Sequence, residues 1–422
     1  MFQYQKTRTY FAQIADGFED LARKELEALG ATQIKTAFRG LHFQTDAAGL
    51  YRINYQSRLV SRVLAPLISF KCEDRTALYQ AAKSIDWGAL FTLRQTFGIF
   101  SNVSGNENLR HSKFAALCVK DAIADRFRDA SGERPDVDKT DPDVWIHLLV
   151  SRKRAVISLD TSGGSLHKRG YRKESVAAPM KETLAAAMVL LSGWQGDRPL
   201  YDPMCGSGTL LCEAMMNAGR VPAGYLRAGF GFRNLPDFDA ALWRKVKSTA
   251  DAAIRPVATG MVSGSDIAHR AVQAARINCK SLPGGRAINI QCQDYAQING
   301  LENAIILCNP PYGIRLNSDQ DLGVFYKTLG DFLKRRCKGS QAYLYFGNRE
   351  MIKNIGLKPT WKSPCATRAW MGGWSNTSCT RRSSTPGQQS NSDVPAVGFL
   401  FRSGLASRFC GSCDRNAFLG EA

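Results

Sequence analysis

Residues 309–312, Asn-Pro-Pro-Tyr, have the types and the order that chemistry on a planar amine needs. They follow the apolar run 304–308, which predicts a buried strand. The two prolines restrict the backbone and remove two N–H donors, so the segment offers hydrogen-bond acceptors at a strand end. An amide side chain, a carbonyl and a flat ring suit a base with an exocyclic amine. Taken alone, the stretch is equally typical of a strand-terminating turn.

The length and composition indicate a globular protein of several domains. A chain of 422 residues is too long for one ordinary core, so two or three domains are expected. Hydrophobic residues make up 44% and charged residues 22%, as in ordinary globular proteins. We find no apolar run long enough to cross a membrane and no secretory signal at the start, which predicts a cytoplasmic location.

The formal net charge of +19 favours a polyanionic partner, most simply a nucleic acid. Two basic clusters are candidates for phosphate contacts, although a solvated surface is the alternative for each residue. The first lies at the tip of a hairpin predicted from the alternating runs 144–150 and 155–160. The candidates are Arg152, Lys153 and Arg154 in the hairpin, and Lys168, Arg169, Arg172 and Lys173 in the link that follows it.

The cysteines and histidines predict no metal site. Most of the twelve cysteines lie in apolar contexts, where they behave as small buried hydrophobic residues. Cys410 and Cys413 form a lone CxxC without a second pair, and the chain has only five histidines.

The first part of the chain alternates short strands and helices in an α+β order. Strands are predicted at 9–14, 38–43, 60–70 and 97–104, and helices at 18–29, 50–55, 76–84 and 113–128. This rhythm ends at the cationic link 167–174, and a domain boundary is expected near 161–172.

From residue 199 the pattern becomes a regular α/β alternation. Strands are predicted at 200–202, 262–266, 288–292, 305–308 and 341–346, with helices at 180–192, 209–218, 268–278 and 322–335. Such alternation is typical of a parallel, doubly wound sheet, in which ligands bind at the carboxyl ends of the strands.

Polar residues stand at these predicted strand ends. The first strand runs into the glycine-rich loop DPMCGSGT at 202–209, and the next two end at Asp266 and near Asp294. A nicotinamide dinucleotide site is disfavoured, because the third glycine of its motif is missing and the next acid comes late. Asp266 is placed to accept both hydroxyls of a ribose, Ile267 to lie on an adenine face, and Asp294 to accept from the adenine amine.

Residues 181–358 resemble the class I S-adenosylmethionine-dependent methyltransferases that methylate amines. The resemblance places Asp266 at the ribose, Asp294 at the adenine, and the segment 309–313 at the reaction. Its cofactor loop matches Asp202, Cys205, Gly206, Ser207, Gly208 and Thr209, and Asn309 and Ile267 join the cofactor-binding set. The first part of the chain resembles a ferredoxin-like segment followed by a THUMP domain, an RNA-binding module. Together they resemble the 23S ribosomal RNA guanine-N2 methyltransferases.

This resemblance implies an α/β fold with a Rossmann-like methyltransferase sheet after an α+β ferredoxin-like and THUMP region. The expected domains are 1–50 (ferredoxin-like), 51–165 (THUMP-like), 166–361 (methyltransferase) and 362–422 (an atypical tail). S-adenosyl-L-methionine would methylate N2 of a guanosine in large-subunit ribosomal RNA or its assembly intermediate. Asn309 and the Pro310 carbonyl would accept the amine hydrogens, and Tyr312 would stack on the base. An adenine-N6 methyltransferase on RNA or DNA is the alternative.

The tail departs from the family pattern. After Trp361 the sequence is rich in Ser, Arg and Gly without a sustained period, which predicts disorder or a damaged end. A shifted reading frame of 363–380 would give LRNPGLDGRLVKYELY, which is similar to the family ending. We therefore expect a frameshift upstream of Ser363, and an intact frame in the DNA there would refute it. If the final strands are lost, the protein would be a catalytically impaired RNA-binding protein.

Overall fold

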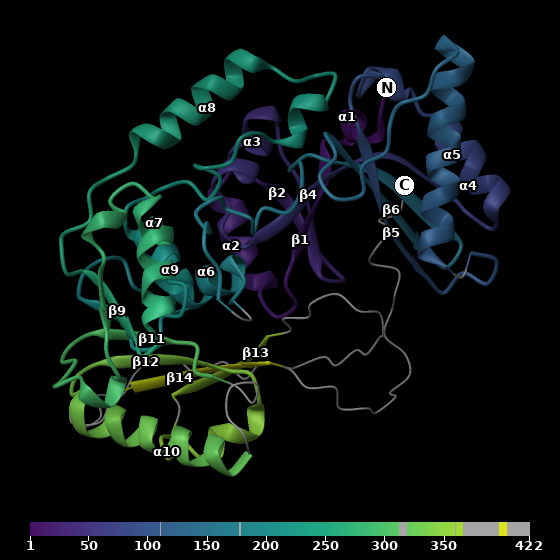
Figure 1. Cartoon of the computed structure of the whole chain (residues 1–422). Coiled ribbons are helices and arrows are strands. Elements are labelled where there is room, and N and C mark those ends of the chain that lie inside the picture. The colour runs from purple at the N-terminus through teal and green to yellow at the C-terminus, as the bar shows by residue number, and fades with distance from the viewer. Residues whose placement is uncertain (110, 177–178, 312–318, 359, 366–395, 403–422) are drawn as a thin grey trace.

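The computed structural model describes residues 1–109, 111–176, 179–311, 319–358, 360–365 and 396–402. Within these residues the strands form two seven-stranded sheets, which lie in different halves of the molecule (Figure 1). The first half is α+β and the second is a parallel α/β sheet. The predicted fold class is therefore confirmed.

The first sheet has the strand order β2-β3-β1-β4-β7-β6-β5. Its pairs are antiparallel except β5 with β6, and β6 and β7 form the predicted hairpin. Because β4 pairs with both β1 and β7, the two predicted N-terminal units share one continuous sheet. The strands are β1 (Thr9–Ile14), β2 (Thr32–Ala37), β3 (Gly40–Gln44), β4 (Val60–Lys71), β5 (Phe97–Ser104), β6 (Val144–Ser151) and β7 (Arg154–Asp160).

The helices of the first half are α1 (Gln3–Thr7), α2 (Glu19–Ala28), α3 (Ala47–Gln56), α4 (Arg75–Ser84) and α5 (Ser112–Ser131), with the short 3-10 turn η1 (Trp87–Ala89). Residue 50, the expected first boundary, lies inside α3. Helix α5 ends at Gly132, whose φ of 78° favours glycine. It packs against β5, where the Phe97 ring lies 5.6 Å from Phe91, which in turn lies 5.1 Å from Phe127.

The second sheet has the order β10-β9-β8-β11-β12-β14-β13, and all of its described pairs are parallel. The strands are β8 (Leu200–Asp202), β9 (Val262–Asp266), β10 (Asn289–Cys292), β11 (Ile305–Cys308), β12 (Gln341–Phe346), β13 (Trp361–Cys365) and β14 (Ala396–Arg402). From β8 the next strands in the sequence, β9 and β10, are added on one side, and from β11 the later strands are added on the other side. The junction between these two strands is thus a topological switch point, where such sheets bind ligands.

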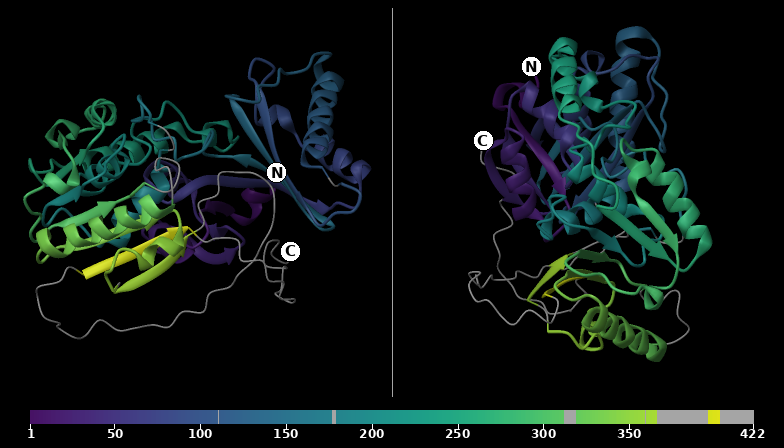
Figure 2. Two further views of the ribbon diagram at one scale, coloured as in Figure 1. Left: turned by 60° about the horizontal axis from the view of Figure 1, so that its bottom comes forward. Right: turned by 90° about the vertical axis from the view of Figure 1, so that its left-hand side faces the viewer.

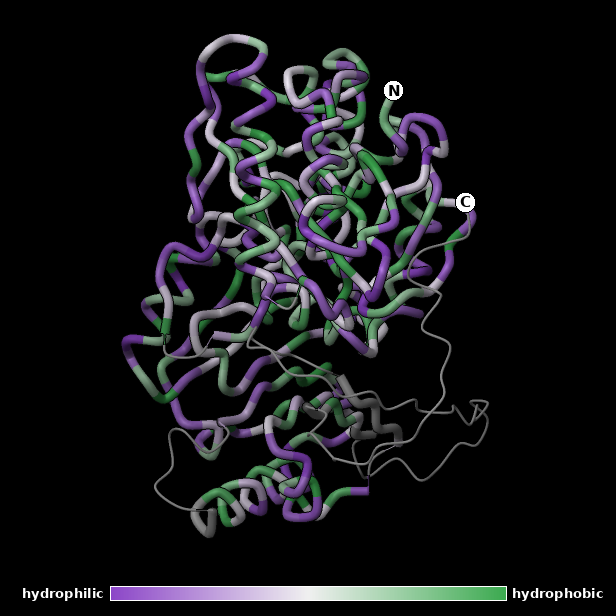
Figure 3. Tube along the Cα trace, turned by 90° about the vertical axis from the view of Figure 1, so that its right-hand side faces the viewer, coloured by the Kyte–Doolittle hydropathy of each residue, from purple (hydrophilic) through white to green (hydrophobic). Residues whose placement is uncertain are grey.

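Helices cover both faces of this sheet. The helices α6 (Glu182–Leu191), α7 (Thr209–Ala218) and α9 (His269–Lys280) lie on one side and α10 (Asp319–Arg336) on the other (Figures 1 and 2). Leu322 and Tyr326 of α10 belong to the buried cluster that includes Ile306 and Leu344 of the sheet. In Figure 3, α10 at the bottom alternates hydrophobic and hydrophilic positions, as expected for a helix with one buried face. Short 3-10 turns complete this half: η2 (Gly231–Asn234), η3 (Gly285–Ala287), η4 (Tyr295–Gln297) and η5 (Arg349–Lys353).

Two segments of the tail are strands, so the expectation of an irregular tail is wrong for β13 and β14. The apolar run of β14 allows it to pair along all of β12. Phe399 is fully buried, and its ring lies 5.0 Å from that of Phe346. The frameshift hypothesis stays a prediction. Cys410 and Cys413 lie outside the described residues.

The insertion between β8 and β9 holds the two halves together. Its helix α8 (Ala240–Ala252) packs on α3 of the first half, and the Trp243 ring lies 5.3 Å from Tyr55 and 6.2 Å from Tyr51. The Tyr55 hydroxyl donates to Asp251, also in α8. One buried hydrophobic cluster extends through both halves, so the first half, in which the sequence predicts an RNA-binding region, is packed against the second. Within the described residues, no helix combines the length and apolar character needed to span a membrane.

Candidate active site

The predicted polar residues meet at one edge of the second sheet. Asp202 ends β8, Asp266 ends β9, Asp294 follows β10 by two residues, and Asn309 follows β11. Since β10, β9, β8 and β11 are neighbours and parallel, their carboxyl ends share one edge. The four residues therefore surround the switch point between β8 and β11.

The glycine loop makes a tight turn from β8 into α7. Gly206 has a φ of 53° and Gly208 a φ of 80°, and a Cβ on Gly208 would lie 3.1 Å from the Ala275 Cβ. The Cys205 N–H donates to the Ser265 carbonyl at 2.9 Å, which fixes the loop against β9. Helix α7 begins directly at Thr209, so its first N–H groups face the site and suit an anionic carboxylate.

The Asp266 carboxylate connects this loop to the next strand end. Its Oδ2 accepts from the Gly206 N–H and its Oδ1 from the Ala268 N–H, both at 2.9 Å. The neighbouring Ile267 is 71% exposed, as a residue that lies against a ligand ring must be. Asp294 caps the turn η4 through the Ala296 N–H. The ribose, adenine-face and adenine-amine roles of these residues stay predictions.

Asp202 is a buried carboxyl with an altered pKa. It is 1% exposed, and its Oδ1 accepts from the Met204 N–H at 3.0 Å. Burial, with a smaller contribution from the negative charge of Asp266, raises the pKa of Asp202 to about 8. A cationic ligand beside it would favour the ionised form, because opposite charge offsets the cost of burial.

Asn309 lies in a small cavity beside the loop. The cavity has a volume of about 60 Å³, and its walls include Asp202, Gly206, Thr209, Met180 and Asn309. The Asn309 Oδ1 is buried and accepts no hydrogen bond from the described residues. A buried acceptor is costly unless a ligand satisfies it, so these residues fit a bound cofactor and an amine donor. Pro310 is buried beside it, and Tyr312 lies outside the described residues.

The basic candidates fall into two groups. Arg152, Lys153 and Arg154 are exposed at the β6–β7 tip on the first sheet, away from the second-sheet edge that carries the site. Lys168 and Lys173 are exposed in the link before α6, nearer the loop. These five residues stay candidates for phosphate contacts.

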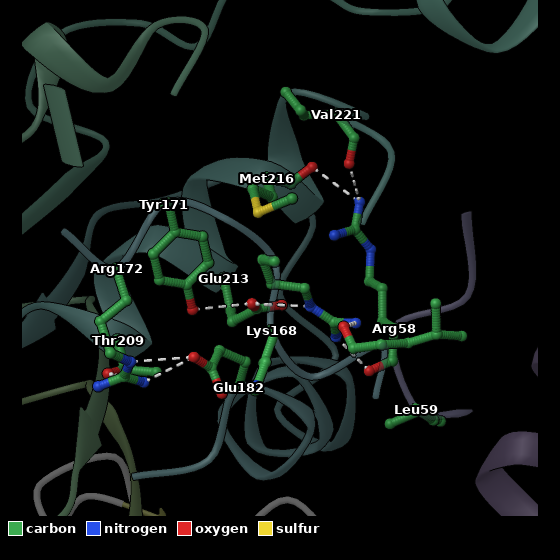
Figure 4. Close-up of polar contacts among 12 residues, drawn as sticks. Arg58, Leu59, Lys168, Tyr171, Arg172, Glu182, Thr209, Glu213, Met216 and Val221 are labelled. Atoms are coloured by element: carbon green, nitrogen blue, oxygen red, sulfur yellow. Dashed lines mark hydrogen bonds and ion pairs between the residues drawn. The ribbon is translucent and has the colours of Figure 1, made fainter. Parts of the chain in front are cut away.

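Arg169 and Arg172 do not present free guanidinium groups to an RNA. Arg169 is 1% exposed, and its guanidinium bonds to Glu213 and to the Arg58 and Leu166 carbonyls. Arg172 pairs with Glu182 and also donates to Ser207 Oγ at 3.4 Å and Thr209 Oγ1 at 3.2 Å (Figure 4). We therefore withdraw both as primary phosphate contacts, because protein acceptors already occupy their donors.

The same contacts reveal residues that sequence reasoning missed. Glu213 of α7 accepts from Arg169 Nε at 3.3 Å and from the Tyr171 hydroxyl at 2.9 Å. Arg58 of the first half donates to the Met216 and Val221 carbonyls at the end of α7. Figure 4 shows the contacts of Arg58 and Glu213 and, beside them, the separate pair of Arg172 with Glu182. Helix α7 is therefore held at one end by the first half and at the other by the link, which fixes the position of the glycine loop.

Asn278 adds a second connection between the link and the loop. Its side chain is buried and donates to the Ser207 carbonyl at 3.0 Å and the Glu174 carbonyl at 2.8 Å. It accepts from the Lys173 and Glu174 N–H groups. The one sequence signal for this network was an acid, Glu213, within the otherwise apolar start of a helix.

We predict that Arg169→Met destabilises the protein by about 3 kcal/mol, because it leaves the Glu213 carboxylate buried without its cation. The midpoint of urea-induced unfolding measures this loss. The neighbouring exposed variant Lys168→Ala is the matched control and should shift the midpoint little. Equal midpoints for the two variants would show that the buried pair contributes no net stability.

Three family models match the chain in the order expected. The RlmL ferredoxin-like domain matches residues 9–64, the THUMP domain residues 72–160, and the RMKL-like methyltransferase domain residues 169–374. The range 161–172, where a domain boundary is predicted, includes the gap between the end of the second match at residue 160 and the start of the third at residue 169.

Curated relatives agree with these matches. A Synechocystis protein named as an RNA methyltransferase is 42% identical over 360 residues, covering 85% of this chain and 93% of its own length. The ribosomal RNA large subunit methyltransferase K/L of Photobacterium profundum is 37% identical over 83% of this chain. The chain spans 50% of the length of that relative.

Solved structures give the same fold. SMU.472, described as a methyltransferase and complexed with SAH, has a TM-score of 0.73 at 27% identity, covering 83% of this chain and 93% of its own. A Listeria monocytogenes protein described as a predicted N6-adenine-specific DNA methylase has a TM-score of 0.73 at 28% identity. The match covers 85% of this chain and 94% of the Listeria chain. The predicted family and cofactor are thereby confirmed. The chain belongs to the THUMP-domain class I RNA methyltransferases that use S-adenosylmethionine.

Proposed function

We propose that this protein methylates the exocyclic N2 amine of a guanosine in large-subunit ribosomal RNA. The observation that carries the proposal is the buried Asn309 Oδ1, which lies beside the cofactor loop and accepts no hydrogen bond from the described residues. An amine hydrogen of a base would satisfy this acceptor. The N2 position is an inference from the family resemblance, since the amine of any base fits this description.

The chemistry requires orientation more than acid or base strength. S-adenosylmethionine, when bound, supplies an electrophilic methyl group on a sulfonium. The lone pair of an aryl amine is delocalised into its ring, so the amine attacks poorly unless the protein changes its geometry. Asn309 Oδ1 and the Pro310 carbonyl would accept the two amine hydrogens and aim the lone pair at the methyl carbon. The amine nitrogen would form the new C–N bond to the methyl carbon as the C–S bond breaks, with the electron pair of that bond staying on the sulfur, and the amine would then lose one proton to solvent.

Several residues would hold the cofactor. The Gly206–Thr209 turn and the start of α7 would hold its carboxylate, Asp266 the ribose hydroxyls, and Asp294 the adenine amine. Asp202 would face the cationic part from within the cavity. The target base must leave its stack to reach Asn309, so the substrate is a flipped or single-stranded nucleotide.

Ribosomal RNA is supported by charge and by relatives. The net charge of +19 and the exposed basic residues 152–154, 168 and 173 suit a phosphate backbone. The relatives named for large-subunit ribosomal RNA are twice as long as the segment that this chain matches. We therefore propose the activity of these relatives for this chain. The substrate would be either the free ribosomal RNA or a ribosomal assembly intermediate.

Adenine-N6 methylation is the second candidate. The Listeria protein with the same fold is described as a predicted N6-adenine-specific DNA methylase. The Asn-Pro-Pro-Tyr segment suits the adenine amine as well as the guanine amine. The THUMP match favours RNA over DNA.

We expect transfer of labelled methyl from S-adenosylmethionine to unmodified large-subunit ribosomal RNA, with N2-methylguanosine as the product nucleoside. Digestion of the RNA and chromatography of the nucleosides identify the base. Label on adenosine, or on DNA alone, would contradict the guanine assignment. Cofactor binding without transfer to any substrate would instead favour a catalytically impaired RNA-binding protein.

A further inference from the structure

A second, larger cavity lies next to the cofactor cavity. It has a volume of about 370 Å³ and is formed by the link and the residues just before α6. It shares Pro179 and Met180 with the smaller cavity that reaches Asn309. A group bound in the larger cavity would therefore lie beside the base that enters the site.

The walls of this cavity carry an excess of positive charge. The lining contains four basic side chains, Lys168, Arg169, Arg172 and Lys181, and one carboxylate, Glu182. The two arginines are fixed in place by Glu213 and Glu182, whereas the two lysines are exposed to solvent. Because Glu213 and Glu182 neutralise the two guanidinium groups, the excess charge of the wall comes from the ammonium groups of the two exposed lysines, which suit an anion with several acceptor oxygens.

His167 in the same wall is largely buried and lies close to these cations. Burial, followed by the charges of Lys181, Arg169 and Lys168 and a smaller contribution from Arg62, lowers the pKa of His167 to about 4. The imidazole is therefore neutral at pH 7, and its Nδ1 lies 2.6 Å from Ser165 Oγ. It adds a neutral polar group to the wall without offsetting the lysine charges.

We propose that the cavity between the link and α6 binds a phosphodiester group of the substrate strand, next to the nucleotide that is methylated. This inference rests on the proposed function, because it takes the ligand to be an RNA. Lys168 and Lys181 would contact the phosphate oxygens, and the two arginines, held by Glu213 and Glu182, would keep the wall behind them rigid. The site would hold the backbone while the neighbouring base turns toward Asn309, which separates positioning of the strand from recognition of the base.

The pKa of His167 offers a test that does not need catalysis. Histidine resonances are titrated by NMR in the full-length protein, alone, with inorganic phosphate and with a single-stranded hexaribonucleotide. His167→Gln assigns the signal among the five histidines. We expect the hexaribonucleotide to raise the pKa of His167 by about one unit, since a bound anion offsets the neighbouring cations.

Lys168→Ala should weaken hexaribonucleotide binding several-fold and reduce the pKa change, whereas the exposed control Lys245→Ala on α8 should bind as the wild type does. A shift with inorganic phosphate but none with the hexaribonucleotide would overturn the proposal in favour of a free-phosphate site. No shift with either ligand would also overturn it.

Methyl transfer separates this inference from the proposed function. In the wild type, transfer to ribosomal RNA tests the function itself. Lys168→Ala should raise KM for RNA several-fold, with kcat and cofactor affinity unchanged. The slope of the logarithm of RNA affinity against the logarithm of salt concentration should fall by the amount that corresponds to about one phosphate contact. If the wild type is active and Lys168→Ala keeps the wild-type KM for RNA, the proposed function stands and the cavity is not the phosphate site.

Discussion

Asn309→Ala is expected to reduce methyl transfer by about 100- to 1000-fold, the loss seen when one group that stabilises a transition state is removed. The reason is that the Asn309 Oδ1 is the buried acceptor beside the cofactor loop, and alanine offers the amine no acceptor. Cofactor affinity should change little, because the loop, Asp202 and Asp266 stay in place. Single-turnover transfer and calorimetric titration with S-adenosylmethionine measure the two effects separately.

Two further variants decide what the asparagine does. Asn309→Asp keeps an acceptor oxygen and should retain more activity than Asn309→Leu, which fills the space without one. Asn289→Ala, at the exposed start of β10, is the matched control and should turn over as the wild type does. Wild-type rates in Asn309→Ala would remove Asn309 from the reaction.

The strand ends of the second sheet were predictable because they depend on local sequence. The runs that become β8, β9 and β11 are short, each begins with an apolar residue, and each ends at or just before a polar one, so both the strands and their polar ends could be found. Parallel pairing then places Asp202, Asp266 and Asn309 at one edge whatever the long-range details.

Contacts between distant parts of the chain were not predictable in this way. Lys168 and Arg169 are adjacent and chemically alike, yet one is exposed and the other is buried against Glu213, 44 residues later in the sequence. The sequence of a basic link is the same whether a given cation faces solvent or is buried in an ion pair. The packing of α8 on α3 was likewise hidden, since an amphipathic helix does not specify the surface that it covers.

The tail shows the opposite error. Its composition, rich in serine and arginine, predicted irregular structure throughout 362–422. Residues 398–400 of β14 are nevertheless buried beside β12, because the run 396–401, which contains no charged residue, is long enough to pair in parallel with the whole of β12. Average composition over about sixty residues concealed two short strands, β13 and β14.

The second large effect is expected at Asp202, where stability and cofactor binding should respond to pH in opposite directions. Its pKa is about 8 in the folded protein against 3.8 for an ordinary aspartate, mainly because the group is buried. Between these values the folded protein keeps a proton that the unfolded chain releases. Stability of the unliganded protein should therefore fall as pH rises from about 4 to 8. Asp202→Asn removes this loss, so its thermal midpoint should exceed that of the wild type at pH 8.

Cofactor binding should show the opposite sign. The cationic cofactor favours the ionised carboxylate, so wild-type affinity should rise with pH, by up to about tenfold per unit below pH 8, and then level off. Asp202→Asn should bind more weakly at pH 8 and show no such rise, whereas the exposed control Asp197→Asn should follow the wild type. Calorimetric titration from pH 6 to 9 measures both curves. A wild-type affinity that does not vary with pH would mean that Asp202 does not face the charge of the cofactor. The higher thermal midpoint of the asparagine variant would still stand, because it depends on the raised pKa of Asp202 in the unliganded protein and not on the cofactor.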